Sequence, residues 1–182
     1  MDLVTSLDQT FQHAHGVIAN VQPAQYGRAT PCEEWTVGDL LEHMIGVVAR
    51  LGAAAAGTPP DGFAFELSTD PAGQFKQAAS AALAGWRSPG VMDRVVDGGA
   101  GPMPGRVLAG INLLDTATHT WDLATATDQP RDLPVDIAEV ALEVSLQTIA
   151  PEIRPGRFGP ELTPRADASA TERLVAFLGR TP

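Results

Sequence analysis

A chain of 182 residues, 44% of them hydrophobic, is long enough to bury a core and suits a single domain over 1–182. Its formal net charge of −10, with 12 Lys and Arg against 22 Asp and Glu and no basic cluster, argues against a nucleic-acid partner. The sequence shows no signal peptide and no apolar run long enough for a membrane span, and its one cysteine, Cys32, permits no intramolecular disulfide. We therefore expect a cytoplasmic protein with no membrane partner.

The first half of the chain predicts three helices. Apolar residues at steps of three and four indicate an amphipathic helix over 3–21. The next helix has the strongest start signal, since Thr36 is a natural N-cap and Asp39 stands in the place of the capping-box acid. This helix is expected to run to about residue 56, where a Gly-Thr-Pro-Pro sequence ends it. A third helix is predicted over 70–86, with an aspartate as its N-cap and a proline in its first position.

The pattern changes after this third helix and then becomes helical again. Residues 91–96 predict a short strand, and the Gly/Pro-rich stretch that follows is expected to be irregular. The rest of the chain predicts four segments: a helix over 105–127, a helix over 134–150, an extended stretch over 151–170 and a short helix over 171–178. The fold class is therefore all-α, a helical bundle with short additional helices and room for a short strand pair, and with residues 151–182 as a C-terminal extension packed on it.

The helix predicted over 105–127 carries ionisable residues on its apolar face. At about 100° per residue, His119 and Asp122 point within about 40° of Asp115, on the stripe that also holds Leu108 and Ile111. Burying an ionised carboxylate without a partner costs on the order of several kcal/mol. A divalent cation would explain the pattern, because Asp at i and His at i+4 place two ligands one turn apart. A hydrogen-bonded Asp–His pair without a metal also explains it, and such a pair is the commoner meaning of this spacing.

A metal site needs a further ligand from another helix. The histidines other than His119 are His13, His15 and His43. His43 lies at the border of the apolar face of its helix, where a side chain can reach between two helices, whereas His13 and His15 cannot share one helix face. A hydrogen-bonded histidine at the edge of a core explains His43 as well, so spacing alone leaves both interpretations open.

Three separated segments carry a family resemblance. They are residues 30–43, Thr-Pro-Cys-x-x-Trp-Thr-Val-x-Asp-Leu-Leu-x-His, residues 115–124, Asp-x-x-x-His-x-Trp-Asp-Leu-Ala, and residues 172–180, Glu-Arg-Leu-Val-Ala-Phe-Leu-Gly-Arg. In this order they resemble the DinB-like metal-binding superfamily that includes the mycothiol-dependent maleylpyruvate isomerases, and the last resembles an actinobacterial branch of it. The resemblance implies a DinB-like four-helix bundle with a divalent metal, zinc or nickel, held by His43, Asp115 and His119. Many relatives have Glu at the position of Asp115, so the carboxylate here has a shorter reach.

The resemblance also implies a reaction class. A thiol bound at an open metal position ionises near neutral pH, and the thiolate can attack an electrophilic carbon. We therefore expect a thiol-dependent, mycothiol-type S-transferase or detoxifying enzyme whose partners are a small-molecule thiol and an electrophile. The isomerases carry an additional C-terminal domain for which this chain has no room, which favours transfer over isomerisation. The alternative is a non-catalytic, metal-dependent binding or regulatory bundle domain.

Other residues carry weaker indications. Asp122 could orient His119 or accept a proton, or it could be a buried acid bonded to the backbone. Arg50 lies on the face of His43 nearly two turns on and could meet an anionic substrate group, or it could be solvated. Cys32 precedes a helix N-terminus, which favours a thiolate, although packing is the commoner role of a lone cysteine. Apolar surface on the loop over 57–64 and on the alanine-rich helix after it predicts a homodimer.

Overall fold

The computed structural model describes residues 2–33, 35–58, 65–99 and 101–182, and helices dominate it. The α-helices in these ranges are α1 (Leu3–Ala19), α2 (Val37–Ala56), α3 (Pro71–Trp86), α4 (Gly105–Ala126), α5 (Val135–Thr148) and α6 (Ala170–Phe177). Short 3-10 helices follow α1 and α5, η1 (Pro23–Gln25) and η2 (Pro151–Ile153). The strands β1 (Val95–Asp97) and β2 (Pro102–Pro104) form one antiparallel pair. The predicted all-α fold with a short strand pair is confirmed.

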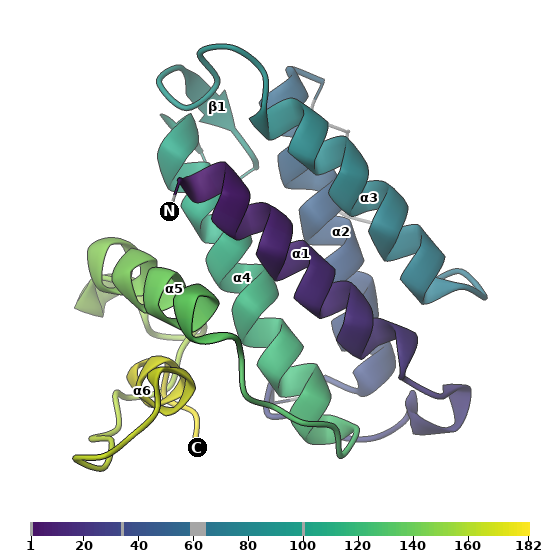
Figure 1. The fold of residues 1–182 in the computed structure, drawn as a ribbon, viewed down its shortest axis with the longest axis vertical. Helices are drawn as coiled ribbons and strands as arrows, with labels where there is room; N and C mark the ends of the chain where they lie inside the picture. The colour runs from purple at the N-terminus through teal and green to yellow at the C-terminus, as the bar shows by residue number, and fades with distance from the viewer. Residues whose placement is uncertain (1, 34, 59–64, 100) are drawn as a thin grey trace.

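The first four helices form a bundle around the core. Helices α1 and α2 each contact both α3 and α4, so the four surround a common interior (Figure 1). Fully buried side chains from all four helices fill it, among them Leu7, Leu41, Phe75 and Leu113. Helix α5 packs on α4 and α1, and α6 packs on α5, on the side of α4 away from α3 (Figure 1). None of the described helices has the length and apolar character needed to cross a membrane.

Helix α2 begins and ends where the sequence predicts, because both signals are local. The Thr36 hydroxyl accepts a hydrogen bond from the backbone N–H of Asp39, and the Asp39 carboxylate accepts one from the backbone N–H of Thr36 at 2.8 Å. This reciprocal capping box fixes the first turn. At the other end Gly57 adopts φ +82°, a left-handed conformation that favours glycine and ends the helix. The α2 register that carries His43 is thus set independently of the rest of the fold.

The strand prediction is wrong in its bounds. Residues 90–94 form turns, with the backbone N–H groups of Asp93 and Arg94 both bonded to the Gly90 carbonyl, so β1 begins only at Val95. The stretch expected to be irregular contains β2, in which Pro104 pairs with Val95. Prolines fit there because each strand of a two-stranded sheet has an edge that needs no N–H donor. Helices predicted over 3–21, 134–150 and 171–178 differ from the observed ones by one or two residues at their ends.

The C-terminal segment folds back against the bundle. A turn at Gly179, with φ +82°, places its backbone so close to Gly159 that an added Cβ would lie 2.5 Å from the Gly159 carbonyl carbon. The Arg154 guanidinium donates to the Phe177 carbonyl and lies 5.0 Å over the Phe177 ring. The backbone N–H of Arg180 bonds to the Val175 carbonyl at 2.9 Å. Arg180, which follows the turn at Gly179, thereby points toward Asp122 on α4.

Candidate metal centre

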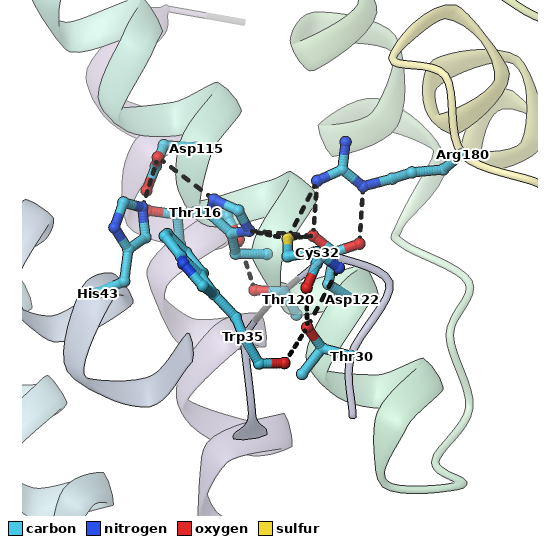
Figure 2. Close-up of polar contacts among 10 residues, drawn as sticks. Thr30, Cys32, Trp35, His43, Asp115, Thr116, Thr120, Asp122 and Arg180 are labelled. Carbon is cyan, nitrogen blue, oxygen red and sulfur yellow. Dashed lines mark hydrogen bonds and ion pairs between the residues drawn. The ribbon is translucent and has the colours of Figure 1, made fainter. Parts of the chain in front are cut away.

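The structure brings His43, Asp115 and His119 together between α2 and α4 (Figure 2). His43 Nε2 lies 3.2 Å from Asp115 Oδ1, and His119 Nε2 lies 3.6 Å from the same oxygen. One ligand atom from each of the three residues lies within 4.8 Å of the other two. Their side chains are 29%, 20% and 13% exposed, so the cluster is partly accessible to solvent. The arrangement combines two imidazoles and a carboxylate, a donor set that suits zinc and nickel.

The second oxygen of Asp115 is the feature that fits a cation. Asp115 Oδ2 is buried and accepts no hydrogen bond from any described residue. Burial by itself raises the pKa of this carboxyl, but the nearby His119, His43 and Arg50 outweigh burial and hold the pKa below its ordinary value. Asp115 is therefore ionised, with one oxygen left for a further positive partner. A buried anionic oxygen without a donor is costly unless such a partner neutralises it.

A second group of donor atoms shares His119 with the first. Cys32 Sγ lies 3.6 Å from His119 Nδ1 and 3.2 Å from Asp122 Oδ2, and His119 Nδ1 lies 3.0 Å from Asp122 Oδ2. Asp122 is completely buried. Because its carboxylate can only accept, the network assigns the Nδ1 proton of His119 to this contact, which leaves Nε2 facing Asp115. The imidazole thus has a different carboxylate at each nitrogen (Figure 2).

This second group already contains a cation from the protein itself. Arg180 Nε donates to Asp122 Oδ1 at 2.7 Å, and Arg180 Nη2 donates to Asp122 Oδ2 at 2.8 Å. The same Nη2 lies 3.5 Å from Cys32 Sγ. Burial lowers the pKa of Arg180, but Asp122 outweighs it and raises that pKa, while Arg180 and His119 together hold the pKa of Asp122 at about 2 against the effect of burial. Of the two groups, the cluster of His43, Asp115 and His119 is therefore the one suited to a metal.

The carboxylates on both sides of His119 favour its charged form. Burial lowers the pKa of His119, yet the charge of Asp115, the hydrogen bonds that His119 makes to Asp122 and Cys32, and the charge of Asp122 raise it to about 10. In the metal-free protein His119 is consequently an imidazolium at neutral pH. A metal ion at Nε2 would replace that proton, because a histidine ligand must be neutral at the coordinating nitrogen.

Aromatic stacking supports the two histidines. The Trp35 ring centroid lies 4.6 Å from that of His43 and 5.9 Å from that of His119 (Figure 2). The two imidazoles meet edge to face, at 4.8 Å and 83°. The loop before α2 holds this arrangement, since the Thr30 hydroxyl accepts from the Cys32 N–H at 3.1 Å and donates to the Trp35 carbonyl at 3.0 Å. Trp35 therefore limits the movement of both rings.

The weaker candidates differ in where the structure places them. Asp122 contacts His119 directly, as the orienting role requires. Arg50 lies close enough to Asp115 that each influences the other's pKa, and burial lowers the pKa of Arg50 overall. Cys32 reaches His119, which its place in the chain did not indicate. Sequence analysis missed Arg180 as a contributor to the site, and its place in the tail motif was the only signal for it.

The protein is therefore a helical bundle with a candidate metal centre, in which two histidines and an aspartate from adjacent helices meet. The family model described as "Mycothiol maleylpyruvate isomerase N-terminal domain" matches residues 7–124, and the chain belongs to this family. The matched span contains the three residues of the cluster and Asp122, whereas Arg180 lies beyond it.

Similar proteins occur in Mycobacterium tuberculosis. The chain is 35% identical over 172 residues to "Uncharacterized protein MT0763" of strain CDC 1551 / Oshkosh and, to the same extent, to "Uncharacterized protein Rv0738" of strain ATCC 25618 / H37Rv. Each match covers 91% of this chain and 90% of the relative, so the similarity is not confined to the segment that the family model matches. No solved structure matches the chain significantly.

Proposed function

We propose that this protein binds one divalent metal ion through His43, Asp115 and His119 and uses it in a reaction between a small thiol of the mycothiol type and a small electrophile. The observation that carries the proposal is the buried Oδ2 of Asp115, which accepts no hydrogen bond from the described residues, beside two histidine nitrogens. Membership of a family described by mycothiol supports the choice of thiol. Zinc and nickel are the metals we expect from two imidazoles and one carboxylate.

Each of the three ligands would use an atom that already faces the cluster. His43 and His119 would each bind through Nε2, and Asp115 would bind through its carboxylate. Three protein ligands leave a coordination position open, as in catalytic rather than structural sites. A thiol bound at this open position would be a thiolate at neutral pH, because the cation would stabilise its negative charge.

The protein's own residues prepare the centre for this chemistry. Asp115 supplies the negative charge that offsets part of the charge of a divalent ion, and Asp122 holds His119 by Nδ1 so that Nε2 faces Asp115. Trp35 packs against both rings and limits their movement. Arg50 places a positive charge within electrostatic reach of Asp115, where it would attract an anionic group of the thiol or of the electrophile.

The expected reaction is S-transfer. The thiol gives up its proton to water, and its sulfur forms a bond to an electrophilic carbon. The electron pair of the bond that breaks leaves with a halide, stays on the oxygen of an opened epoxide or passes to the neighbouring carbon of an activated alkene, and in the last two cases that atom takes up a proton from water. No protein side chain needs to act as the nucleophile, because the small thiol supplies it. Cys32 donates to Asp122 and lies next to the Arg180 guanidinium, which assigns it to the support of His119 rather than to attack on a substrate.

The test is thiol consumption by metal-loaded protein. Purified protein would be incubated with mycothiol and a panel of aryl halides, epoxides and activated alkenes, with the S-conjugate measured by mass spectrometry. Conjugate formation that disappears in His119→Ala, but persists in His15→Ala on α1, would support the proposal. Metal binding without conjugation of any electrophile would favour the non-catalytic binding domain instead.

A further inference from the structure

We propose that Arg180 is a positioning residue of this metal centre: it holds the Asp122 carboxylate, and through Asp122 it fixes the direction in which His119 presents Nε2. The inference rests on the proposed function in one respect, that a metal binds at that nitrogen. It adds a residue from beyond the segment that the family model matches. The C-terminal segment then forms part of the centre.

The contacts form a continuous chain from the C-terminus to the cluster. Two nitrogens of Arg180 bond to the two oxygens of Asp122, at 2.7 and 2.8 Å, and Asp122 Oδ2 accepts from His119 Nδ1 at 3.0 Å (Figure 2). The other ring nitrogen of His119 lies 3.6 Å from Asp115. A bidentate guanidinium fixes the plane of a carboxylate, because both oxygens are bonded to the same rigid fork. The plane of Asp122 in turn sets the direction of the imidazole.

Burial makes this chain stiff. Asp122 is fully buried and the Arg180 side chain is 12% exposed, so water cannot readily take the place of either partner. Asp122 Oδ2 is shared by donors from Arg180, His119 and Cys32. If the guanidinium were removed, Oδ1 would lose its bond to Arg180 Nε and the buried carboxylate would lose the cation that bonds to both of its oxygens. Rotation of Asp122 would then cost less, and His119 would lose its fixed direction.

The backbone at Arg180 is held by close packing at Gly179 and by a hydrogen bond to α6. The turn at Gly179 packs against the backbone of Gly159, and the Arg180 N–H bonds to the last turn of α6 through the Val175 carbonyl. Helix α6 packs on α5, which packs on α4, where Asp122 lies. The guanidinium is thus delivered from an ordered segment, as a positioning role requires.

Arg180 could instead serve only to fasten the C-terminal segment, and Arg154 offers the matched control. Arg154 also fastens this segment, since it donates to the Phe177 carbonyl and lies over the Phe177 ring. Neither of these two contacts involves Asp122 or His119. Loss of Arg154 should therefore loosen the C-terminal segment without altering the metal centre.

The experiment compares the parent with Arg180→Gln, Arg180→Lys and Arg154→Gln. Affinity for Zn²⁺ is measured by competition with a chromophoric chelator, coordination by the visible spectrum of the Co²⁺-loaded protein, and the direction of His119 by the NMR signal of its Nδ1 proton in metal-free protein. We expect Arg180→Gln to weaken Zn²⁺ binding about tenfold and to shift or broaden the His119 signal. Arg180→Lys keeps the charge but not the fork, so it should restore part of the loss. Arg154→Gln should lower the melting temperature, measured in addition, and leave the Zn²⁺ affinity, the Co²⁺ spectrum and the His119 signal at parent values.

Either of two results would overturn the inference. The first is that Arg180→Gln binds Zn²⁺ with the affinity of the parent and shows an unchanged His119 signal. The second is that Arg180→Gln and Arg154→Gln lose Zn²⁺ affinity to the same extent. If Arg180→Gln does not fold, Arg180→Lys decides by the same readouts. If the parent binds no metal, the proposed function fails, and the metal-free His119 signal still decides whether Arg180 positions this ring.

Discussion

At the scale of the residue, Asp115 controls both imidazoles of the cluster. Its Oδ1 lies 3.2 Å from His43 Nε2 and 3.6 Å from His119 Nε2, and its charge is the largest of the effects that raise the pKa of His119. The side chain therefore serves the metal-free protein, as a counter-charge to His119, and would serve the metal-bound protein as a ligand. These two roles predict different effects for one substitution.

Asp115→Asn keeps the shape of the side chain and removes its charge. We expect the pKa of His119 to fall in the metal-free variant, because Asp122 remains as the only carboxylate bonded to that ring. We also expect Zn²⁺ affinity to fall at least about tenfold, since an amide is a weaker ligand for a divalent ion than a carboxylate. An NMR titration of His119 and a chelator competition measure the two effects. An unchanged His119 pKa would contradict the electrostatic assignment.

The depressed pKa of Asp122 should make the free energy of unfolding depend on pH in acid. Its pKa is held at about 2, below the ordinary value of 3.8, despite burial and because of His119 and Arg180. A carboxyl whose pKa is lower in the folded than in the unfolded protein stabilises the fold at pH values above its unfolded pKa. This contribution is lost as the pH falls through its folded pKa. The window for Asp122 therefore lies between about pH 4 and about pH 2, and the contribution is on the order of 2 kcal/mol.

The comparison with Asp122→Asn isolates this effect from the other carboxyls. Chelator-treated parent and variant are unfolded in urea at a series of pH values from about 5 to about 2. The difference between their free energies of unfolding should shrink over this range by on the order of 2 kcal/mol, because only the parent takes up a proton at this position. A difference that stays constant with pH would show that the buried ion pair does not depress the pKa of Asp122.

At the scale of the element, the approach of α2 to α3 positions the helix that carries His43. A Cβ on Gly52 would lie 2.4 Å from the Cα of Ala82, and a Cβ on Gly85 would lie 2.6 Å from the Gly52 carbonyl oxygen. The two backbones touch at this crossing, which only residues without side chains allow. The crossing fixes where α2 lies in the bundle, and hence where His43 meets α4.

Gly52→Ala should therefore destabilise the protein by about 1–3 kcal/mol, since the added methyl group must displace backbone rather than a flexible side chain. Gly16→Ala on α1 is the matched control, because a Cβ there meets nothing within 4 Å. Alanine favours a helix over glycine by about 1 kcal/mol, so the control should be neutral or stabilising. Urea unfolding of both variants measures the difference. Equal stabilities would mean that the helices can separate at the crossing at little cost.

The elements were predictable where their signals are local. Thr36 and Asp39 cap α2, Asp70 caps α3, and these residues stand next to the turns they fix. Asp115 and His119 were placed on one face by helix periodicity alone. The strand bounds failed because a turn around Gly90 outweighs the apolar pattern of the residues after it. A local signal thus located most helices within two residues.

The parts of the site that sequence analysis missed depend on contacts between distant residues. Arg180 meets Asp122 across 58 residues, and Cys32 meets His119 across 87. No periodicity connects such positions, because only the packing of α6, α5 and the loop before α2 brings them together. Spacing made His43, Asp115 and His119 candidates but left a metal-free explanation open, and the family resemblance favoured the metal site. The three-dimensional structure then added the residues that support His119.

At the scale of the whole molecule, we propose that residues 1–182 form one cooperative unit with 151–182 packed on the bundle. The backbone N–H of Leu133 bonds to the Thr171 hydroxyl at 3.0 Å, and Arg180 bonds to Asp122. These contacts join the C-terminal segment to both α4 and the start of α5. The homodimer stays a prediction, since part of the loop expected to present apolar surface, residues 59–64, lies outside the described residues.

Cooperativity predicts one unfolding transition. Far-ultraviolet circular dichroism, which follows all helices, and tryptophan fluorescence, which follows Trp35, Trp86 and Trp121, should give the same midpoint in urea. Two separated midpoints would show that the C-terminal segment unfolds by itself, and Arg180 would then be a weak support for His119.

The most direct test of the central claim is metal analysis of untagged, purified protein beside three variants. His43→Ala and His119→Ala each remove a proposed ligand, and His15→Ala removes a histidine of α1 outside the cluster. We predict about one zinc or nickel ion per chain in the parent and in His15→Ala, and strongly reduced metal in the other two. Metal retained in His119→Ala, or a parent that stays metal-free after incubation with both ions, would contradict the account and leave Asp115 and His119 as a structural ion pair.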